Sequence, residues 1–262
     1  MTLKNAKPVI ELIDVCKIYP SGPKDLFYAL KNINLTLKEG EFVSIIGKSG
    51  SGKSSMMNIL GCLDPVKVGT YLFSGENVST FQDFELSELR SQQIGFIFQS
   101  YNLLDKYSLL ENVALPLSYN NIGRKERFKI AAEYLKVVGL EDRMNHKPGD
   151  VSGGQRQRAA IARALVNKPR IILADEPTGN LDSNTELEIL SLLKDLHLKY
   201  NTTIIIVTHD EAVALYADRI VTLFDGLVYA DVDFTKVEAE LEVENPKAAV
   251  KPDLENKEEP KE

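Results

Sequence analysis

The sequence predicts an α/β fold with a mostly parallel sheet core, an N-terminal antiparallel β subdomain and a helical insertion. Three observations predict this class. A glycine-rich loop at residues 47–54 lies between a short β-branched strand and a helix. Two continuous apolar runs, residues 171–174 and 203–207, are typical of central parallel strands covered on both faces. Residues 100–150 show helical patterns and no strand pattern, so we interpret them as an insertion.

Composition and net charge limit the classes of function. The 262 residues suggest one or two domains, and an apolar fraction of 44% is enough for a sizeable core. With 31 basic and 38 acidic residues, the net charge is −7, which argues against nucleic acid as the main partner. Cys16 and Cys62, the only cysteines, predict reduced, cytosolic thiols. No stretch approaches the ~18 apolar residues of a spanning helix, so we expect membrane contact only through a partner.

The first part of the sequence predicts an antiparallel sheet beside the glycine-rich loop. Residues 9–19 indicate a strand with polar interruptions, and residues 20–23 carry the Pro and Gly of a turn. Residues 33–37 alternate apolar and polar side chains, as in a half-buried strand. A turn at residues 38–41 leads into the β-branched strand 42–46. Strands so closely spaced by turns favour antiparallel pairing.

The middle of the sequence changes from mixed to helical character. A strand between glycines is expected at residues 69–75, and a buried strand at residues 94–98. Helices are expected at residues 55–60, 83–90, 109–115, 124–138 and 156–165. The last three of these helices define a helical subdomain of about residues 100–165.

The last part of the sequence returns to strands. Between the two apolar runs we expect a helix that begins at Ser183, with Ser183 and Glu186 as a capping box. Residues 219–223 and 227–229 predict a hairpin around Asp225-Gly226.

The C-terminal segment has a different composition. From about residue 245, Glu, Lys and Pro dominate and large apolar residues are almost missing. Such a segment cannot offset its ordering entropy by burying apolar side chains. We therefore predict a disordered charged tail at residues 245–262 and a single folded domain at residues 1–244.

The glycine-rich loop carries the first chemical signal. Its sequence, Gly47-Lys48-Ser49-Gly50-Ser51-Gly52-Lys53-Ser54, matches the phosphate-binding pattern G-x-x-x-x-G-K-[ST]. The glycines allow a tight turn whose N–H groups face phosphate oxygens, and the helix N-terminus adds positive dipole. Lys53 is expected to reach the β- and γ-phosphates, and the Ser54 hydroxyl is expected on Mg²⁺.

Two carboxylates end the strand at residues 171–174. In open α/β sheets, ligands bind at the carboxyl ends of the strands, where Asp175 and Glu176 stand. Asp175 can hold Mg²⁺, directly or through water. Glu176 lies one residue further and can polarise an attacking water as a general base. Acids at strand ends are common by themselves, so this reading depends on the phosphate loop.

A second glycine-rich segment precedes the helix at residues 156–165. In Ser152-Gly153-Gly154-Gln155, the serine is an expected N-cap and the glycines leave backbone amides open for close approach. The segment is therefore a second anion-binding helix N-terminus in one chain. Residue chemistry alone leaves open whose phosphate it meets.

The motifs in their order resemble the nucleotide-binding subunit of an ABC transporter over about residues 8–230. The Ser152–Gln155 motif is the most specific mark, and it departs only in Val151, where leucine is usual. In finer detail, the sequence resembles the macrolide-exporter and lipoprotein-release (MacB/LolD-like) branch of this family. The stretches that carry this likeness are residues 60–64, 94–104 and 174–183.

The resemblance implies further roles at matching positions. Tyr19, upstream of the loop, would stack on adenine, and Gln99 would ligate Mg²⁺ and sense the γ-phosphate. His209 would contact the γ-phosphate and orient water together with Glu176. Asp182 would sit at the seam of a dimer and link its two sites.

The expected site combines residues inferred from the motifs with residues implied by the resemblance. Glu176 and His209 are the expected catalytic residues, and the expected Mg²⁺ ligands are Ser54, Gln99 and Asp175. The expected ATP contacts are Tyr19, Gly47, Lys48, Ser49, Gly50, Ser51, Gly52, Lys53, Ser54, Ser55, Gln99, Ser152, Gly153, Gly154, Gln155 and Asp182.

The resemblance also implies partners and a location. Two copies would pack head to tail on ATP, each nucleotide lying between the loop of one subunit and the Ser152–Gln155 motif of the other. The dimer would power a separate transmembrane permease, at the cytoplasmic face of the cell membrane, for efflux or for lipoprotein or antimicrobial-peptide handling. A short helix of the permease would dock near residues 99–115.

Two other classes remain open. A cell-division or signalling ABC ATPase transmits force or a signal without moving cargo. A soluble ABC ATPase acting on ribosomes or DNA usually carries two cassettes or long insertions, whereas this chain has one cassette and an acidic balance.

Overall fold

The structure is a computed structural model that describes residues 6–20, 25–120 and 122–235. The tail expected at residues 245–262 lies outside this range. Within the described ranges, no helix is both long enough and apolar enough to span a bilayer.

A six-stranded, mostly parallel sheet forms the centre, in the order β10-β9-β3-β8-β7-β6. Pairing is parallel from β9 through β6, and only β10 joins its neighbour antiparallel, as the expected hairpin with β9. The fold class expected from the apolar runs is confirmed. The strands are β3 (Phe42–Ile46), β6 (Ile94–Phe98), β7 (Ile171–Asp175), β8 (Thr203–Thr208), β9 (Arg219–Phe224) and β10 (Leu227–Asp233).

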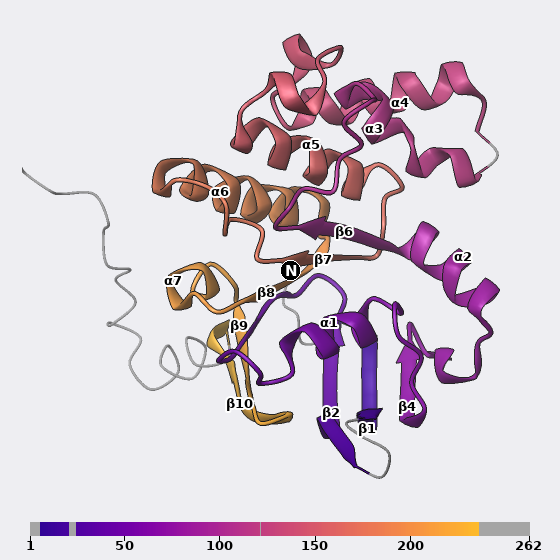
Figure 1. The fold of residues 1–262 in the computed structure, drawn as a ribbon, viewed down its shortest axis with the longest axis vertical. Coiled ribbons are helices and arrows are strands. Elements are labelled where there is room, and N and C mark those ends of the chain that lie inside the picture. Colours follow the sequence, from indigo (N-terminus) through magenta and orange to yellow (C-terminus); the bar gives the residue numbers. More distant parts are fainter. Residues whose placement is uncertain (1–5, 21–24, 121, 236–262) are drawn as a thin grey trace, which may run out of the picture.

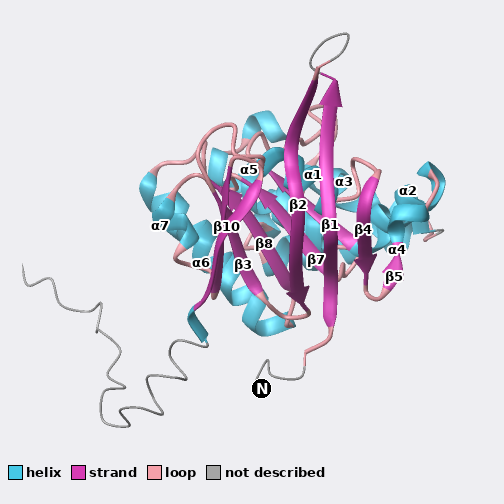
Figure 2. Ribbon diagram, turned by 90° about the horizontal axis from the view of Figure 1, so that it is seen from below, coloured by secondary structure: helices cyan, strands magenta, loops and turns pink. Residues whose placement is uncertain are grey.

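A four-stranded antiparallel sheet, ordered β2-β1-β4-β5, lies beside it (Figure 2). Its second strand begins at Leu26 rather than Ile33, because its first residues pair with the end of β1. The expected N-terminal antiparallel subdomain is therefore confirmed, with a longer hairpin. The strands are β1 (Pro8–Pro20), β2 (Leu26–Lys38), β4 (Val68–Phe73) and β5 (Glu76–Asn77).

Helices cover both faces of the central sheet (Figure 1). They are α1 (Lys53–Leu60), α2 (Asp83–Gln93), α3 (Leu109–Ala114), α4 (Arg124–Val137), α5 (Gly153–Leu165), α6 (Ser183–Tyr200) and α7 (Glu211–Ala214). Short 3-10 turns are η2 (Val78–Thr80), η3 (Pro116–Asn120), η4 (Glu141–Arg143) and η5 (Pro148–Asp150).

The capping box expected at Ser183 is wrong. Helix α6 does begin at Ser183, but Asp182 is its N-cap and accepts from the Thr185 N–H. The acid one residue earlier has the extended backbone that a cap needs, whereas Ser183 already lies in the helix.

Alternation along the central strands produces two cores. Ile45, Leu173 and Ile205 point to one face, where α1 and the antiparallel sheet cover them. Ile172 and Ile206 point to the other face, where helices α3 to α6 pack. Since successive strand residues face opposite sides, the continuous apolar runs serve both cores at once.

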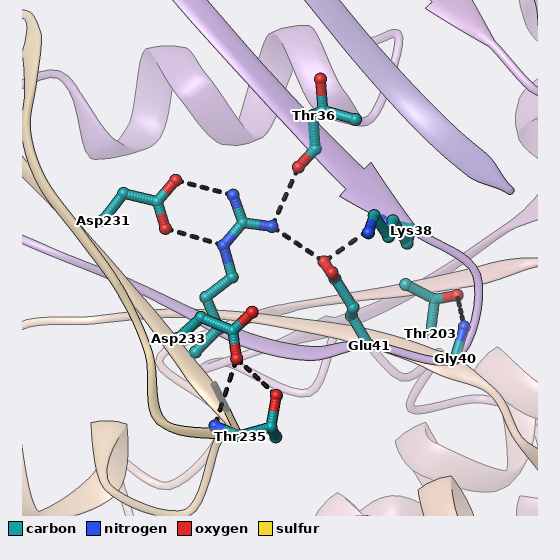
Figure 3. A network of polar contacts seen from close by, with 9 residues as sticks. Thr36, Lys38, Gly40, Glu41, Thr203, Asp231, Asp233 and Thr235 are labelled. Atoms are coloured by element: carbon teal, nitrogen blue, oxygen red, sulfur yellow. Dashed lines mark hydrogen bonds and ion pairs between the residues drawn. The ribbon is translucent and has the colours of Figure 1, made fainter. Parts of the chain in front are cut away.

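Arg219 joins the two sheets at the end opposite the strands' carboxyl termini. Its guanidinium donates to both carboxylate oxygens of Asp231 at 2.7 Å each, to the Thr36 carbonyl at 2.9 Å and to Glu41 Oε2 at 2.9 Å (Figure 3). Glu41 is only 7% exposed, and Oε2 also accepts from the Lys38 N–H. The fork geometry of arginine suits this shared role, which ties β2 to β3, β9 and β10.

Candidate functional site

The glycine-rich loop joins the carboxyl end of β3 to α1. Lys53, the first residue of α1, donates from Nζ to the Gly47 carbonyl at 2.6 Å and the Lys48 carbonyl at 3.1 Å, so its amine lies over the loop. The N-cap Gly52 has φ +104°, and a Cβ there would lie 2.6 Å from the Ala29 carbonyl oxygen. No side chain caps α1. Its N–H groups and its positive end are therefore open to an anion.

Glu176 and His209 meet at the carboxyl ends of β7 and β8. Glu176 Oε1 lies 2.6 Å from His209 Nδ1 and accepts from the His209 backbone N–H at 3.1 Å. The Thr208 hydroxyl donates to Oε2 at 3.0 Å. The Glu176 side chain is 19% exposed, whereas the His209 side chain is 71% exposed. The carboxylate is thus oriented from both of its oxygens, and the imidazole faces outward.

At this strand edge, the pKa values of Asp175 and His209 are both raised. Burial and the neighbouring Glu176 charge raise the pKa of Asp175, and the Lys53 ammonium partly offsets this. The hydrogen bond to Glu176, and then its charge, raise the pKa of His209 above its ordinary value of 6.5. Two acids, an imidazole and an amine therefore interact at one end of the sheet.

Gln99 follows β6 directly and approaches the same edge. Its carbonyl accepts from Asn180 Nδ2 at 2.9 Å, and a Cβ on Gly179 would lie 2.6 Å from Gln99 Nε2. Glycine at position 179 thus leaves room for the Gln99 amide. The β6–β7 register pairs Phe98 with Asp175, so Gln99 and Asp175 belong to neighbouring strand ends.

The donor chemistry at this edge fits Mg²⁺. Ser54, Gln99 and Asp175 offer oxygen donors, which this ion prefers. A divalent cation also stabilises an acid such as Asp175, whose pKa is raised by burial and a second carboxylate. Across the part of the chain that the structure covers, no cluster of three His, Cys, Asp or Glu residues offers a richer ligand set.

The Ser152–Gln155 segment caps α5. Ser152 Oγ accepts from the Gln155 N–H at 3.2 Å, and Gln155 Oε1 accepts from the Ser152 N–H at 3.0 Å, which confirms Ser152 as the N-cap. A Cβ on Gly154 would lie 2.4 Å from Thr185 Cγ2, so α5 packs closely against the start of α6. There, both carboxylate oxygens of Asp182 accept from Thr185.

The structure places the two glycine-rich helix ends on opposite faces of the central sheet. Helix α1 belongs to the core that faces the antiparallel sheet, and α5 belongs to the core of the helical face (Figure 1). Lys53, Asp175, Glu176, Gln99 and His209 are brought together at one sheet edge. The Ser152–Gln155 segment is instead grouped with Asp182 and Thr185.

Tyr19 lies beside the phosphate loop, on the antiparallel sheet. Its hydroxyl donates to Asp64 Oδ2 at 3.1 Å and lies 3.5 Å from the Ser55 hydroxyl oxygen. Lys17 Nζ is 5.1 Å from the centroid of its ring. The Tyr19 hydroxyl thus lies between the first turn of α1 and the turn that follows this helix.

Three contact residues escaped sequence reasoning. Thr208 orients Glu176, Asn180 binds the Gln99 carbonyl and Thr185 binds Asp182. Thr208 has a detectable signal, because a polar residue directly follows the apolar run at residues 204–207. Thr185 stands three residues after an acid at a helix start, which is the spacing of a side-chain cap.

Comparisons with known proteins agree with this geometry. The family model described as "ABC transporter" matches residues 30–179. The chain is 51% identical over 224 residues to the uncharacterized ABC transporter ATP-binding protein MJ0796 of Methanocaldococcus jannaschii, covering 84% of this chain and 95% of that protein. It is 49% identical over 224 residues to the macrolide export ATP-binding/permease protein MacB of Hyphomonas neptunium, covering 86% of this chain but 34% of that protein. The chain therefore spans about a third of the length of this relative.

Solved structures show the same likeness. A dimeric structure of the ATP-binding cassette MJ0796 in a post-hydrolysis state, bound to ADP and Pi, aligns with a TM-score of 0.79 at 48% identity. It covers 86% of this chain and 98% of that chain. The structure of cbiO1 from Clostridium perfringens, part of the transporter complex cbiONQ, aligns with a TM-score of 0.79 at 28% identity over 92% of this chain and 96% of that chain.

Proposed function

Because this chain belongs to the ABC transporter family of ATP-binding subunits, we propose that its ATP hydrolysis powers a separate transmembrane permease. The printed name of the MacB relative joins an ATP-binding part and a permease, and this chain matches about a third of that protein. In this proposal, residues 1–244 form one ATPase domain, with a helical subdomain at about residues 100–165.

The observation that carries the proposal is the oriented Glu176 carboxylate beside Lys53 and His209. A bound triphosphate offers Lys53 charged acceptors, which are stronger than the two loop carbonyls it contacts. Glu176, held by Thr208 and His209, accepts a proton from the water that attacks the γ-phosphate. The raised pKa of His209 favours its charged form, which would stabilise negative charge on the transferred phosphoryl group.

Ser54, Gln99 and Asp175 are the residues that would hold Mg²⁺. When bound, the ion neutralises charge on the phosphate oxygens. Gln99 additionally connects this edge to the surface of the helical subdomain, since Asn102 and Phe98 nearby line an adjoining cavity.

That cavity, of about 810 Å³, is the proposed docking place for a short permease helix. Apolar side chains of α2, β6 and η3 line it, and Phe84 and Tyr119 at its rim are 77% and 72% exposed. Phe98, the residue before Gln99, lines this cavity, so docking and nucleotide binding can affect each other. Association with the cytoplasmic face of the membrane follows from this contact.

Homodimerisation on ATP completes the proposal. Each chain presents two glycine-rich helix N-termini, at α1 and α5, on opposite faces of one sheet. A second copy can bring its Ser152–Gln155 segment to the nucleotide held by the first. The dimeric state of the MJ0796 cassette structures supports this arrangement.

Substitution of Lys53 by alanine tests the function. We expect Lys53→Ala to abolish ATP turnover and to weaken nucleotide binding, because the triphosphate loses its charged donor. Steady-state phosphate release and calorimetric binding measure the two effects. Lys125→Ala, at an exposed position of α4, is the control and should behave as wild type. A turnover rate of Lys53→Ala within about threefold of the wild-type rate would contradict the assignment. Such a change corresponds to well under 1 kcal/mol of activation free energy.

A further inference from the structure

Tyr19 stands on a part of β1 that the sheet supports from one side only. The pairing of β1 with β4 ends at Cys16–Val68, whereas its pairing with β2 continues to Tyr19–Phe27 and Pro20–Leu26. Figure 2 shows this end of the hairpin projecting beyond the rest of the sheet. A two-stranded ribbon is marginally stable by itself. The position of Tyr19 therefore depends on contacts outside the ribbon.

Asp64 supplies the main contact. Its Oδ2 accepts from the Tyr19 hydroxyl at 3.1 Å and lies 3.0 Å from Lys17 Nζ. Lys17 in turn sits 5.1 Å from the centroid of the Tyr19 ring, within the range of a cation–π contact. Its side chain is 13% exposed, so this ion pair is less screened than a surface pair.

The charge state of Asp64 agrees with this arrangement. Burial raises the pKa of Asp64, but the hydrogen bond and charge of Lys17 and the hydrogen bond of Tyr19 outweigh it and lower the pKa on balance. The carboxylate is therefore ionised at neutral pH and accepts a charge-assisted hydrogen bond from the phenol.

Asp64 itself is fixed to the phosphate-binding helix. The backbone N–H groups of Leu63 and Asp64 both donate to the Asn58 carbonyl of α1, at 2.8 and 3.2 Å. Arg90 of α2 donates to the Cys62 carbonyl at 2.6 Å. The turn that carries Asp64 is thus held by two helices and moves with α1.

We propose that Asp64, assisted by Lys17, is a positioning residue for the adenine base. It holds the Tyr19 ring at a set orientation relative to α1, so that the base platform and the phosphate loop are aligned before ATP binds. This inference rests on the proposed stacking of Tyr19 on adenine. Neither Asp64 nor Lys17 is assigned to contact the nucleotide.

The test compares a nucleotide with a phosphate chain that has no base. Calorimetry with Mg²⁺ measures the Kd of ATP and of inorganic tripolyphosphate for wild type, Tyr19→Ala, Tyr19→Phe, Asp64→Ala and the double variant Tyr19→Phe/Asp64→Ala. Asp14→Asn is the matched control, because Asp14 lies on the same strand but pairs with Asn34 of β2.

We expect Asp64→Ala and Tyr19→Phe each to weaken ATP binding about fivefold or more, and to leave tripolyphosphate binding within about twofold of wild type. The double variant should bind ATP about as Asp64→Ala does, because both changes remove the same hydrogen bond. Asp14→Asn should bind both ligands as wild type does.

Other results overturn the inference in distinct ways. Equal weakening of ATP and tripolyphosphate by Asp64→Ala means that Asp64 supports the phosphate loop instead. Additive effects in the double variant mean that Asp64 does not act through the Tyr19 hydroxyl. If Asp64→Ala does not fold, Tyr19→Phe alone decides, and ATP binding equal to wild type refutes the positioning role. If Tyr19→Ala binds ATP normally, the stacking role fails, and with it the inference.

Discussion

Glu176 is the residue on which the proposed chemistry depends most. It has φ +44°, a left-handed value that is uncommon for a residue other than glycine. Its backbone N–H donates to the Val207 carbonyl at 2.9 Å, and its side chain turns to Thr208 and His209. Neighbouring strand β8 thus determines both the backbone and the carboxylate orientation. Strain retained at such a position is typical of functional sites.

The His209 pKa provides a prediction at this scale. Replacing Glu176 with glutamine removes the negative charge and the charged acceptor, so we expect the pKa of His209 to fall toward 6.5. Because the pKa of His209 is raised in the folded state, protonation of His209 contributes stability that is fully present below pH ~6.5. This contribution is lost as the pH rises through the raised pKa. Titration of the imidazole C–H resonances by NMR measures the shift. An unchanged pKa in Glu176→Gln contradicts the assigned ion pair.

At the scale of elements, glycines set how closely helices approach the sheet. Gly95 of β6 is one example, since a Cβ there would lie 2.4 Å from the Ala164 carbonyl oxygen of α5. The Ala164 carbonyl belongs to the backbone, so it cannot move aside as the end of a flexible side chain can. Strand β6 leads directly to Gln99, and α5 begins with the Ser152–Gln155 segment, so this contact positions two parts of the proposed site.

We expect Gly95→Ala to destabilise the protein by about 1–3 kcal/mol, as overpacking in a well-packed core does. Gly149→Ala is the matched control, because no atom lies within 4 Å of a Cβ at that position. The midpoints of urea unfolding, compared at constant m-value, measure the difference. Equal midpoints for the two variants would show that α5 and β6 can separate without cost.

At the scale of the whole molecule, the two glycine-rich helix N-termini lie on opposite faces of the central sheet. Their faces are separated by the central sheet and by two distinct cores. This division agrees with the dimeric structures of the similar MJ0796 cassette. In the proposed mechanism, ATP binding controls the assembly of two subunits.

We predict that Glu176→Gln forms a persistent dimer with ATP, whereas the wild-type subunit alone is mainly a monomer. Loss of the general base should lower hydrolysis by roughly 10²-fold or more, while ATP contacts remain. Light scattering with and without ATP measures the assembly. Adding Ser152→Arg to Glu176→Gln places a long cationic side chain at the α5 cap and should prevent dimerisation. A single variant that stays monomeric at saturating ATP, or a double variant that dimerises equally well, refutes the arrangement.

The sequence by itself determined the local elements of this protein. The phosphate loop, the Ser152 cap and the buried strands depend on neighbouring residues, whose spacing is visible in the chain. Only the tertiary structure decided which side chains meet. The Glu176–His209 pair joins the ends of two strands, and the Tyr19–Asp64 bond joins a sheet to the turn after α1. These contacts depend on strand order and register, because parallel pairing brings distant segments to one sheet edge, and no local pattern encodes that order.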